Sequence, residues 1–129
     1  MKVNNCIKNL LKFICVLQQN SNELTFSSTN CTKPFLGPSI QGVCYNTRVI
    51  TLYNKFGDLF TTNFYFNNEL RNSSYFRVRD VDDNCCTLEI LESINNTYTY
   101  TGQTIVVNIN CICAVKCIED VYINCWKEV

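Results

Sequence analysis

The chain has 129 residues, of which 47% are hydrophobic, and its eleven basic residues balance eleven acidic ones. A chain of this length forms one domain with a hydrophobic core of its own. The zero net charge and the lack of a basic run exclude the electrostatic surface on which nucleic-acid binding depends. No stretch approaches the roughly 20 apolar residues of a membrane span. We therefore expect neither nucleic acid nor a membrane as a partner.

The N-terminal segment is predicted to form an amphipathic helix over about residues 4–19. Its apolar residues recur at spacings of three and four: Val3, Ile7, Leu10, Ile14 and Leu17. Lys8 and Lys12 interrupt the apolar run and no small-residue cleavage site follows, so we expect no signal peptide. We assign residues 1–20 to an N-terminal helical arm and residues 21–129 to a single cysteine-rich β domain.

The rest of the chain changes from irregular to strand-like patterning. Residues 20–46 are rich in Ser, Thr, Asn, Gly and Pro, which predicts irregular structure. Beyond them apolar residues alternate, which predicts strands at 47–56, 59–66, 74–81, 86–94, 97–101 and 105–117. Gly57-Asp58 predicts a hairpin between the first two strands, and Asn95-Asn96 and Gly102 predict turns. The fold is thus predicted to be mainly β: an antiparallel sandwich or barrel of about six to eight strands with an N-terminal amphipathic helix.

Ten cysteines are the most unusual feature of the composition. On a strand, cysteines two residues apart share a face at about 7 Å and cannot bond with each other. The set predicted to face inward, as intrachain bridges or buried thiols, is Cys86, Cys111, Cys113 and Cys117. The other set lies on helix flanks, loops and the C-terminal tail, where intermolecular disulfides form most easily: Cys6, Cys15, Cys31, Cys44, Cys85 and Cys125.

The residue types argue against catalysis and metal binding. The chain has no histidine, which removes the commonest general base and the Cys–His and Ser–His pairs. Cys111-x-Cys113 supplies thiolates near Cys117, but the paired C-x-x-C motifs of a zinc site are missing. The acidic turn at residues 80–84 lacks the spacing and glycine of a calcium loop. We expect no catalytic residues, no metal and no cofactor.

Four segments carry a family resemblance: KPFLG (33–37), NTRVITLYNKFGDLF (46–60), YFRVRDVDDNCCTLEIL (75–91) and IVVNINCICAVKCIED (105–120). In this order they resemble the cysteine-rich spore outer-coat and exosporium proteins of the CotY/CotZ/ExsY type. The resemblance implies a non-enzymatic building block that self-assembles into disulfide cross-linked sheets around bacterial endospores, with hexagonal order in some members. It also implies that the partners are further copies, up to hexamers and lattices, and other spore coat or exosporium proteins.

The resemblance also implies a location and a set of cysteines. Spore outer layers are deposited from the mother-cell cytoplasm, so a spore-surface protein of this kind needs no signal peptide. By position, the cysteines that match the family are Cys31, Cys85 or Cys86, Cys111, Cys113 and Cys117. Relatives often carry further cysteines where this chain has Thr32-Lys33, Ser73-Ser74 and Thr104. Its cross-link pattern is therefore expected to differ from theirs.

Two other functions stay open at this point. A secreted cysteine-rich binding module would have only internal disulfides and a leader sequence. A thiol-based metal buffer or redox enzyme would bind metal or contain a thiol with a perturbed pKa. The pairing of the cysteines discriminates between these functions and a cross-linked spore coat.

Overall fold

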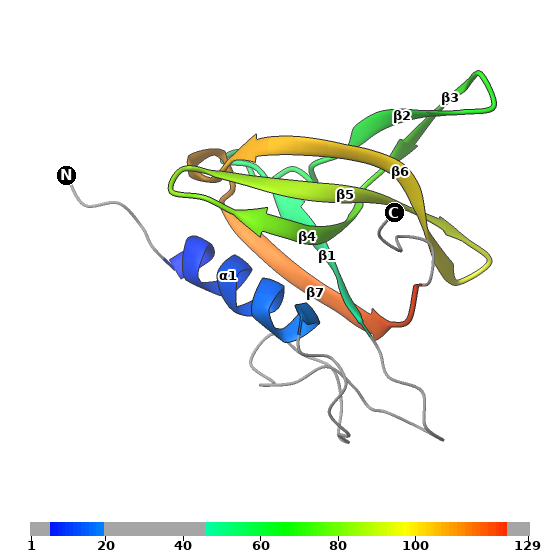
Figure 1. The fold of residues 1–129 in the computed structure, drawn as a ribbon. Helices are drawn as coiled ribbons and strands as arrows, with labels where there is room; N and C mark the ends of the chain where they lie inside the picture. The colour runs from blue at the N-terminus through cyan, green and yellow to red at the C-terminus, as the bar shows by residue number, and fades with distance from the viewer. Residues whose placement is uncertain (1–5, 20–45, 124–129) are drawn as a thin grey trace.

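The computed structural model describes residues 6–19 and 46–123. Helix α1 (Cys6–Gln19) is followed by strands β1 (Thr47–Tyr53), β2 (Thr62–Phe66), β3 (Glu69–Ser73), β4 (Tyr75–Val81), β5 (Cys85–Ile94), β6 (Thr97–Asn108) and β7 (Ala114–Val121). A 3₁₀ turn, η1 (Ile109–Cys111), joins the last two strands. Five strands form one antiparallel sheet in the order β6-β5-β4-β1-β7, and β2 and β3 form a separate ribbon (Figure 1). The prediction of a mainly β, antiparallel fold with an N-terminal helix is confirmed.

The five-stranded sheet has an apolar cluster on each face. Helix α1 covers one face, where Leu11 and Ile14 are fully buried (Figure 1). Strand residues complete that cluster, among them Ile50, Leu52, Phe64, Phe76, Val78, Cys86 and Leu88. Neighbouring residues on the strands point the other way and form a smaller cluster of Val49, Leu91 and Ile123 with several tyrosines around it. Two-sided burial explains why β1 is almost continuously buried.

Two Asn-Asn pairs make the two-residue hairpin turns. Asn95-Asn96 joins β5 to β6, and Asn67-Asn68 joins β2 to β3, each pair with φ values of 53° and 65°. Positive φ at both central positions is the type I′ requirement, which asparagine tolerates better than most residues. The first turn confirms the prediction. The second was not predicted, and neither was strand β3 that follows it.

The predicted hairpin around Gly57-Asp58 is wrong. A tight turn does form there, because the Gly57 amide donates to the Asn54 carbonyl at 3.0 Å and a single bridge pairs Tyr53 with Leu59. The ladder stops at that bridge. Strand β2 pairs with β3 over five residues instead, so β1 and β2 belong to different sheets.

The turn predicted at Gly102 is also wrong, because β6 continues through it. Gly102 has a φ of 88°, and the register between β5 and β6 slips opposite it, between Glu89 and Leu91. This is the geometry of a β-bulge, at which a glycine takes up the left-handed conformation. The Thr101 hydroxyl donates to the Ile90 carbonyl at 2.8 Å and so satisfies an acceptor at the bulge.

The strand predicted over residues 105–117 is interrupted by η1. The side chain of Asn108 accepts a hydrogen bond from the Asn110 amide at 2.9 Å and starts the turn. Ile109 and Ile112 both bury their side chains, at the three-residue spacing of a 3₁₀ turn rather than the two-residue spacing of a strand. Cys111 and Cys113 therefore do not share an inward strand face with Cys117.

The side chain of Gln18 fills a gap between β1 and β4. These strands pair only at Ile50 and Phe76. Next to that pair, the buried Gln18 amide donates to the Val78 carbonyl of β4 at 2.8 Å and accepts from the Arg48 amide of β1 at 3.0 Å. The helix thus supplies through a side chain the hydrogen bonds that the two strands do not make with each other.

A buried ion pair joins β1 to the edge strand β7. The Arg48 guanidinium donates to both carboxylate oxygens of Asp120, at 2.9 and 3.2 Å, and both side chains are fully buried. A bidentate pair of this kind is geometrically specific. It fixes the register of β7 beside β1, where a β-bulge lies between Val49 and Ile50.

Candidate functional site

The structure sorts the described cysteines by accessibility. Cys6, Cys85, Cys111 and Cys113 are exposed, Cys15 is half-buried and Cys86 is buried; of these, Cys85, Cys86, Cys111 and Cys113 are reduced thiols. Cys117 is disulfide-bonded. Cys31, Cys44 and Cys125 lie outside the described residues. The placement of Cys111 and Cys113 corrects the expectation that both face inward, because η1 turns them to the surface.

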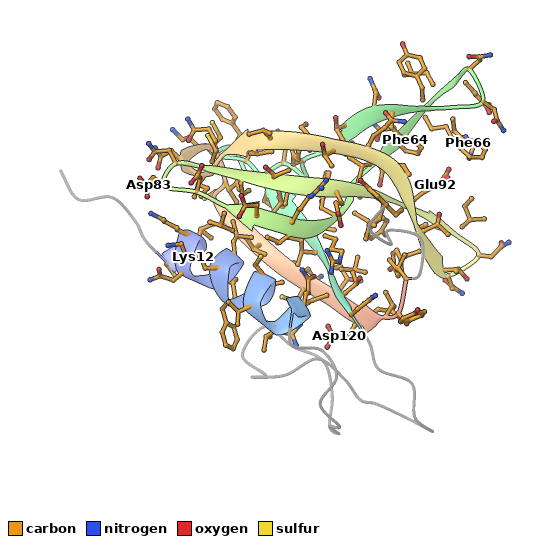
Figure 2. The ribbon with its side chains drawn as sticks, in the orientation of Figure 1. Lys12, Phe64, Phe66, Asp83, Glu92 and Asp120 are labelled. Carbon is orange, nitrogen blue, oxygen red and sulfur yellow. The ribbon has the colours of Figure 1, made fainter. Side chains whose placement is uncertain are left out.

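The four exposed cysteines gather at one end of the sheet, which we call the thiol pole (Cys6, Cys85, Cys111 and Cys113). Figure 1 shows the start of α1, the β4–β5 turn and η1 at this same end. The Ile109 amide donates to the carbonyl of Asn84, the neighbour of Cys85, at 2.8 Å. The ammonium of Lys8 lies 3.7 Å from the Asp83 carboxylate and joins α1 to the β4–β5 turn, where Figure 2 labels Asp83. Three segments that are distant in sequence thus meet here.

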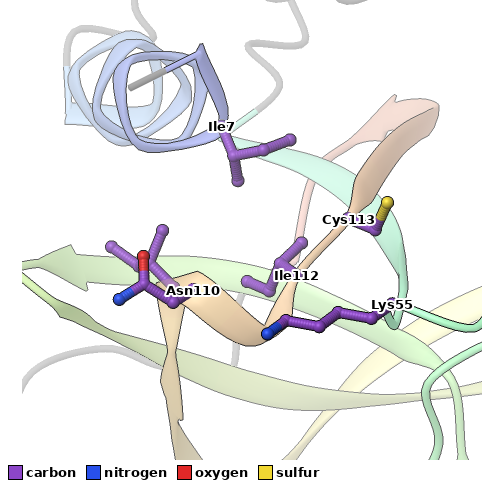
Figure 3. A pocket seen from close by; sticks show the side chains of 6 residues that line it. Ile7, Lys55, Asn110, Ile112 and Cys113 are labelled. Atoms are coloured by element: carbon purple, nitrogen blue, oxygen red, sulfur yellow. The ribbon is translucent and has the colours of Figure 1, made fainter. Parts of the chain in front are cut away.

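A shallow pocket of about 200 Å³ lies within the thiol pole (Figure 3). Its lining combines α1, the turn after β1 and the η1 segment: Ile7, Lys55, Ile109, Asn110, Ile112 and Cys113. The Cys113 amide donates to the Tyr53 carbonyl at 2.8 Å, which holds this thiol at the rim. The backbone around the exposed thiols is therefore fixed by hydrogen bonds.

The two thiols that are not exposed, Cys86 and Cys15, are chemically protected. Burial raises the pKa of the Cys86 thiol to about 11, with the neighbouring Cys85 adding to the rise. Burial also raises the pKa of Cys15, followed by the charge of Asp80; the Cys15 sulfur contacts the Arg79 carbonyl at 3.5 Å. Because the thiolate is the species that attacks a disulfide, a raised pKa slows exchange. At pH 8 about one Cys86 side chain in 1,000 is a thiolate.

The raised pKa of Cys86 predicts a loss of stability at alkaline pH. The folded state favours the neutral thiol, so its contribution is complete below the unfolded value of 9.0 and disappears as the pH rises through about 11. We expect this loss to be on the order of 2 kcal/mol. Urea unfolding of reduced protein between pH 8 and 11 measures it. Cys86→Ala should flatten the pH dependence, whereas the exposed neighbour Cys85→Ala should keep most of it, because burial of Cys86 is the larger cause of the raised pKa; equal slopes for all three proteins would contradict the prediction.

We also searched residues 6–19 and 46–123 for a metal site and for a membrane-spanning helix. Within these ranges no group of three or more histidine, cysteine, aspartate or glutamate side chains is placed to hold a metal ion. No helix of the described part has both the length and the apolar character that a membrane crossing requires. Exposed thiols are the chemically reactive groups that the fold brings together.

Comparison with known families supports one of the remaining functions. The family model described as spore coat protein Z matches residues 1–100. The chain belongs to this spore coat family. The match includes α1, β1 to β5 and the start of β6, and therefore two of the pole cysteines, Cys6 and Cys85. No curated protein and no solved structure matches the chain.

Membership of the spore coat protein Z family indicates a structural role at the spore surface, in contact with other coat components. The sequence resemblance to this family is thereby confirmed. The segment with the highest cysteine density, residues 111–117, follows the matched region. The spatial grouping of Cys111 and Cys113 with Cys6 and Cys85 was not predicted. The cap at Asn108 and the three-residue spacing of buried isoleucines are the sequence features that indicate it.

Proposed function

We propose that this spore coat protein assembles with copies of itself into a two-dimensional, disulfide cross-linked lattice of the outer coat or exosporium, hexagonal as in some members of the family. The cross-links form through the thiol pole. The observation that supports this most is the presence of three exposed reduced thiols, Cys85, Cys111 and Cys113, at one end of a fold whose core packs without them. Cys6 is exposed at the same end.

The chemistry fits late cross-linking after assembly. Thiols remain reduced in a cytoplasm, and dissolved oxygen takes up the two electrons and two protons released by each new disulfide once the mother cell has lysed. Thiol–disulfide exchange is reversible, so copies that meet in a wrong register can separate before the final bonds form. Burial keeps Cys86 out of this exchange, which restricts bonding to the surface. A binding module with only internal disulfides would instead leave no exposed thiol at the pole.

Non-reducing electrophoresis of oxidised recombinant protein tests the proposal. We expect a ladder of covalent oligomers that survives boiling in detergent and collapses to monomer with reductant. Replacing the four pole cysteines by serine should remove most of the ladder. Cys15→Ser is the matched control, because this thiol lies away from the pole and serine keeps its hydrogen-bonding capacity; its ladder should match the wild type.

Two outcomes would contradict the proposal. A sharp monomer band from oxidised wild-type protein would show that the thiols do not join copies. An unchanged ladder from the four-serine variant would assign the cross-links to cysteines outside the pole. Negative-stain images of the assembled wild-type protein test the lattice itself, since an ordered array diffracts and an amorphous aggregate does not.

A further inference from the structure

The outer edge of the five-stranded sheet at β6 carries no charge. The twelve residues TYTYTGQTIVVN contain no Lys, Arg, Asp, Glu or Pro, and most of them are β-branched or aromatic. In the described residues no strand pairs with the outer side of β6. Proteins usually protect such an edge with charges, prolines or a covering element, because an exposed edge is a template for pairing with another chain.

The hydrogen-bond pattern identifies which backbone groups point outward. The Ile109 amide donates to the Asn84 carbonyl, so this opposed pair is of the hydrogen-bonded type. Such pairs alternate along an antiparallel ladder, and therefore Val107 and Ile105 also direct their backbone groups toward β5. Thr104, Val106 and Asn108 consequently present their N–H and C=O groups to the outer edge. All three are exposed, and the Val106 side chain is 63% accessible.

The bulge at Gly102 limits the available edge to residues 104–108. Directly after the bulge, the side-chain amide of Gln103 bonds with both backbone groups of Tyr65 in β2, donating to the carbonyl at 2.7 Å and accepting from the N–H at 3.4 Å. The β2–β3 ribbon thus lies against the edge at Gln103. The five residues beyond it match the usual length of a strand in globular proteins.

A second copy of this chain is the occupant that the edge fits. The opposite edge strand, β7, carries Lys116, Glu119 and Asp120, whereas residues 104–108 offer no charge for an acidic or basic partner to recognise. A two-fold axis places a strand antiparallel to its own copy, so the same patch serves both molecules. Val106 then faces Val106 of the second copy and Ile105 faces Val107, and such β-branched pairs favour cross-strand pairing. The zero net charge of the chain adds no repulsion between copies.

We propose that residues 104–108 of β6 pair antiparallel with the same edge of a second copy and so join two five-stranded sheets across a two-fold axis. The contact deepens the proposed function, since it is the non-covalent step that precedes cross-linking at the thiol pole. It is also a second interface, on the edge of the sheet rather than at its end. A lattice needs at least two different interfaces for each copy, because one isologous contact closes at a dimer.

Sedimentation velocity in the presence of reductant tests the contact without any disulfide. Wild-type protein should dimerise, and Val106→Pro should weaken dimerisation by about tenfold or more, because proline removes an outward N–H that β5 does not use. Val106→Lys keeps the backbone and places a charge on the edge, which should have the same effect. The matched control is Val16→Lys on α1, where valine is 51% exposed; it should dimerise like the wild type.

Amide hydrogen exchange identifies which residues make the contact. In the wild-type dimer the amides of Thr104, Val106 and Asn108 should be protected, and in Val106→Lys they should exchange as exposed amides do. Wild-type protein that stays monomeric at about 100 µM, or variants that dimerise like wild type, would overturn the edge contact. The proposed cross-linking is measured separately, without reductant, so either proposal can fail while the other stands.

Discussion

Asp120→Ala is expected to lower the free energy of unfolding by about 3–5 kcal/mol, because it leaves the fully buried Arg48 guanidinium without its carboxylate. Single domains are stable by only about 5–15 kcal/mol, so this is a large part of the total. Chemical denaturation monitored by circular dichroism measures the change. The loss arises from the uncompensated charge, since a buried ion pair and an apolar pair of similar volume are often equally stable.

Two comparisons separate this cause from a general effect of mutation. The double variant Arg48→Met/Asp120→Leu removes both charges and should regain most of the lost stability. Glu69→Ala breaks the contact between Glu69 and Arg71 at 3.3 Å, in which the Glu69 side chain is 66% exposed. Solvent screens such a pair, so no measurable change is expected. A double variant as unstable as Asp120→Ala would show that packing rather than charge dominates.

Gln18→Met is expected to be the second most damaging of the substitutions considered, although it preserves length and helix propensity. It leaves the Val78 carbonyl and the Arg48 amide without the hydrogen bonds that Gln18 supplies between β1 and β4. Each buried polar group left unsatisfied costs about 1–3 kcal/mol. Denaturant titration measures the combined loss of unfolding free energy from these two groups. A variant as stable as the wild type would mean that water enters the gap and replaces the amide.

Gln103→Met is the matched control for Gln18→Met. Its amide makes the same two-sided contact with one residue of β2, but that contact is exposed and water replaces it. A much smaller loss is therefore expected. Gln18→Glu adds a second check: a protonated carboxyl can donate to Val78, so the pKa of the new side chain should be raised. The stability of that variant relative to the wild type should then be highest below the usual glutamate pKa and fall as the pH rises.

Local patterns in the sequence predicted much of the fold, and tertiary contacts decided the rest. The alternation in residues 86–94 and the Asn95-Asn96 turn gave a correct strand and hairpin because neighbouring residues determine both. The pairing of β1 was not accessible in this way. Its neighbours in the sheet are β4 and β7, more than 20 and 60 residues away in the chain, and the bulges that adjust their registers leave no local pattern.

In the candidate site, too, the sequence predicted some features and tertiary contacts decided others. The number of cysteines predicted cross-linking chemistry, and the family resemblance agrees with the family to which the chain belongs. Which thiols reach the surface depends on η1, where burial of Ile109 and Ile112 overrides the strand-like alternation and turns Cys111 and Cys113 outward. The role of Gln18 was also missed, because a polar residue near the end of a helix gives no indication that two strands separate beside it.

The β2–β3 ribbon is joined to the main sheet by few contacts. Phe64 is its one large apolar side chain buried in the core, and Arg71 ties it to Glu92 by an ion pair near the labelled side chains in Figure 2. A two-stranded ribbon has little stability of its own, so its local opening requires much less free energy than unfolding of the whole domain. Its exposed end, with Tyr65 and Phe66, can therefore change position while the five-stranded sheet stays intact. In the proposed lattice, a rigid sheet with an adjustable aromatic extension could tolerate small errors in the spacing between copies.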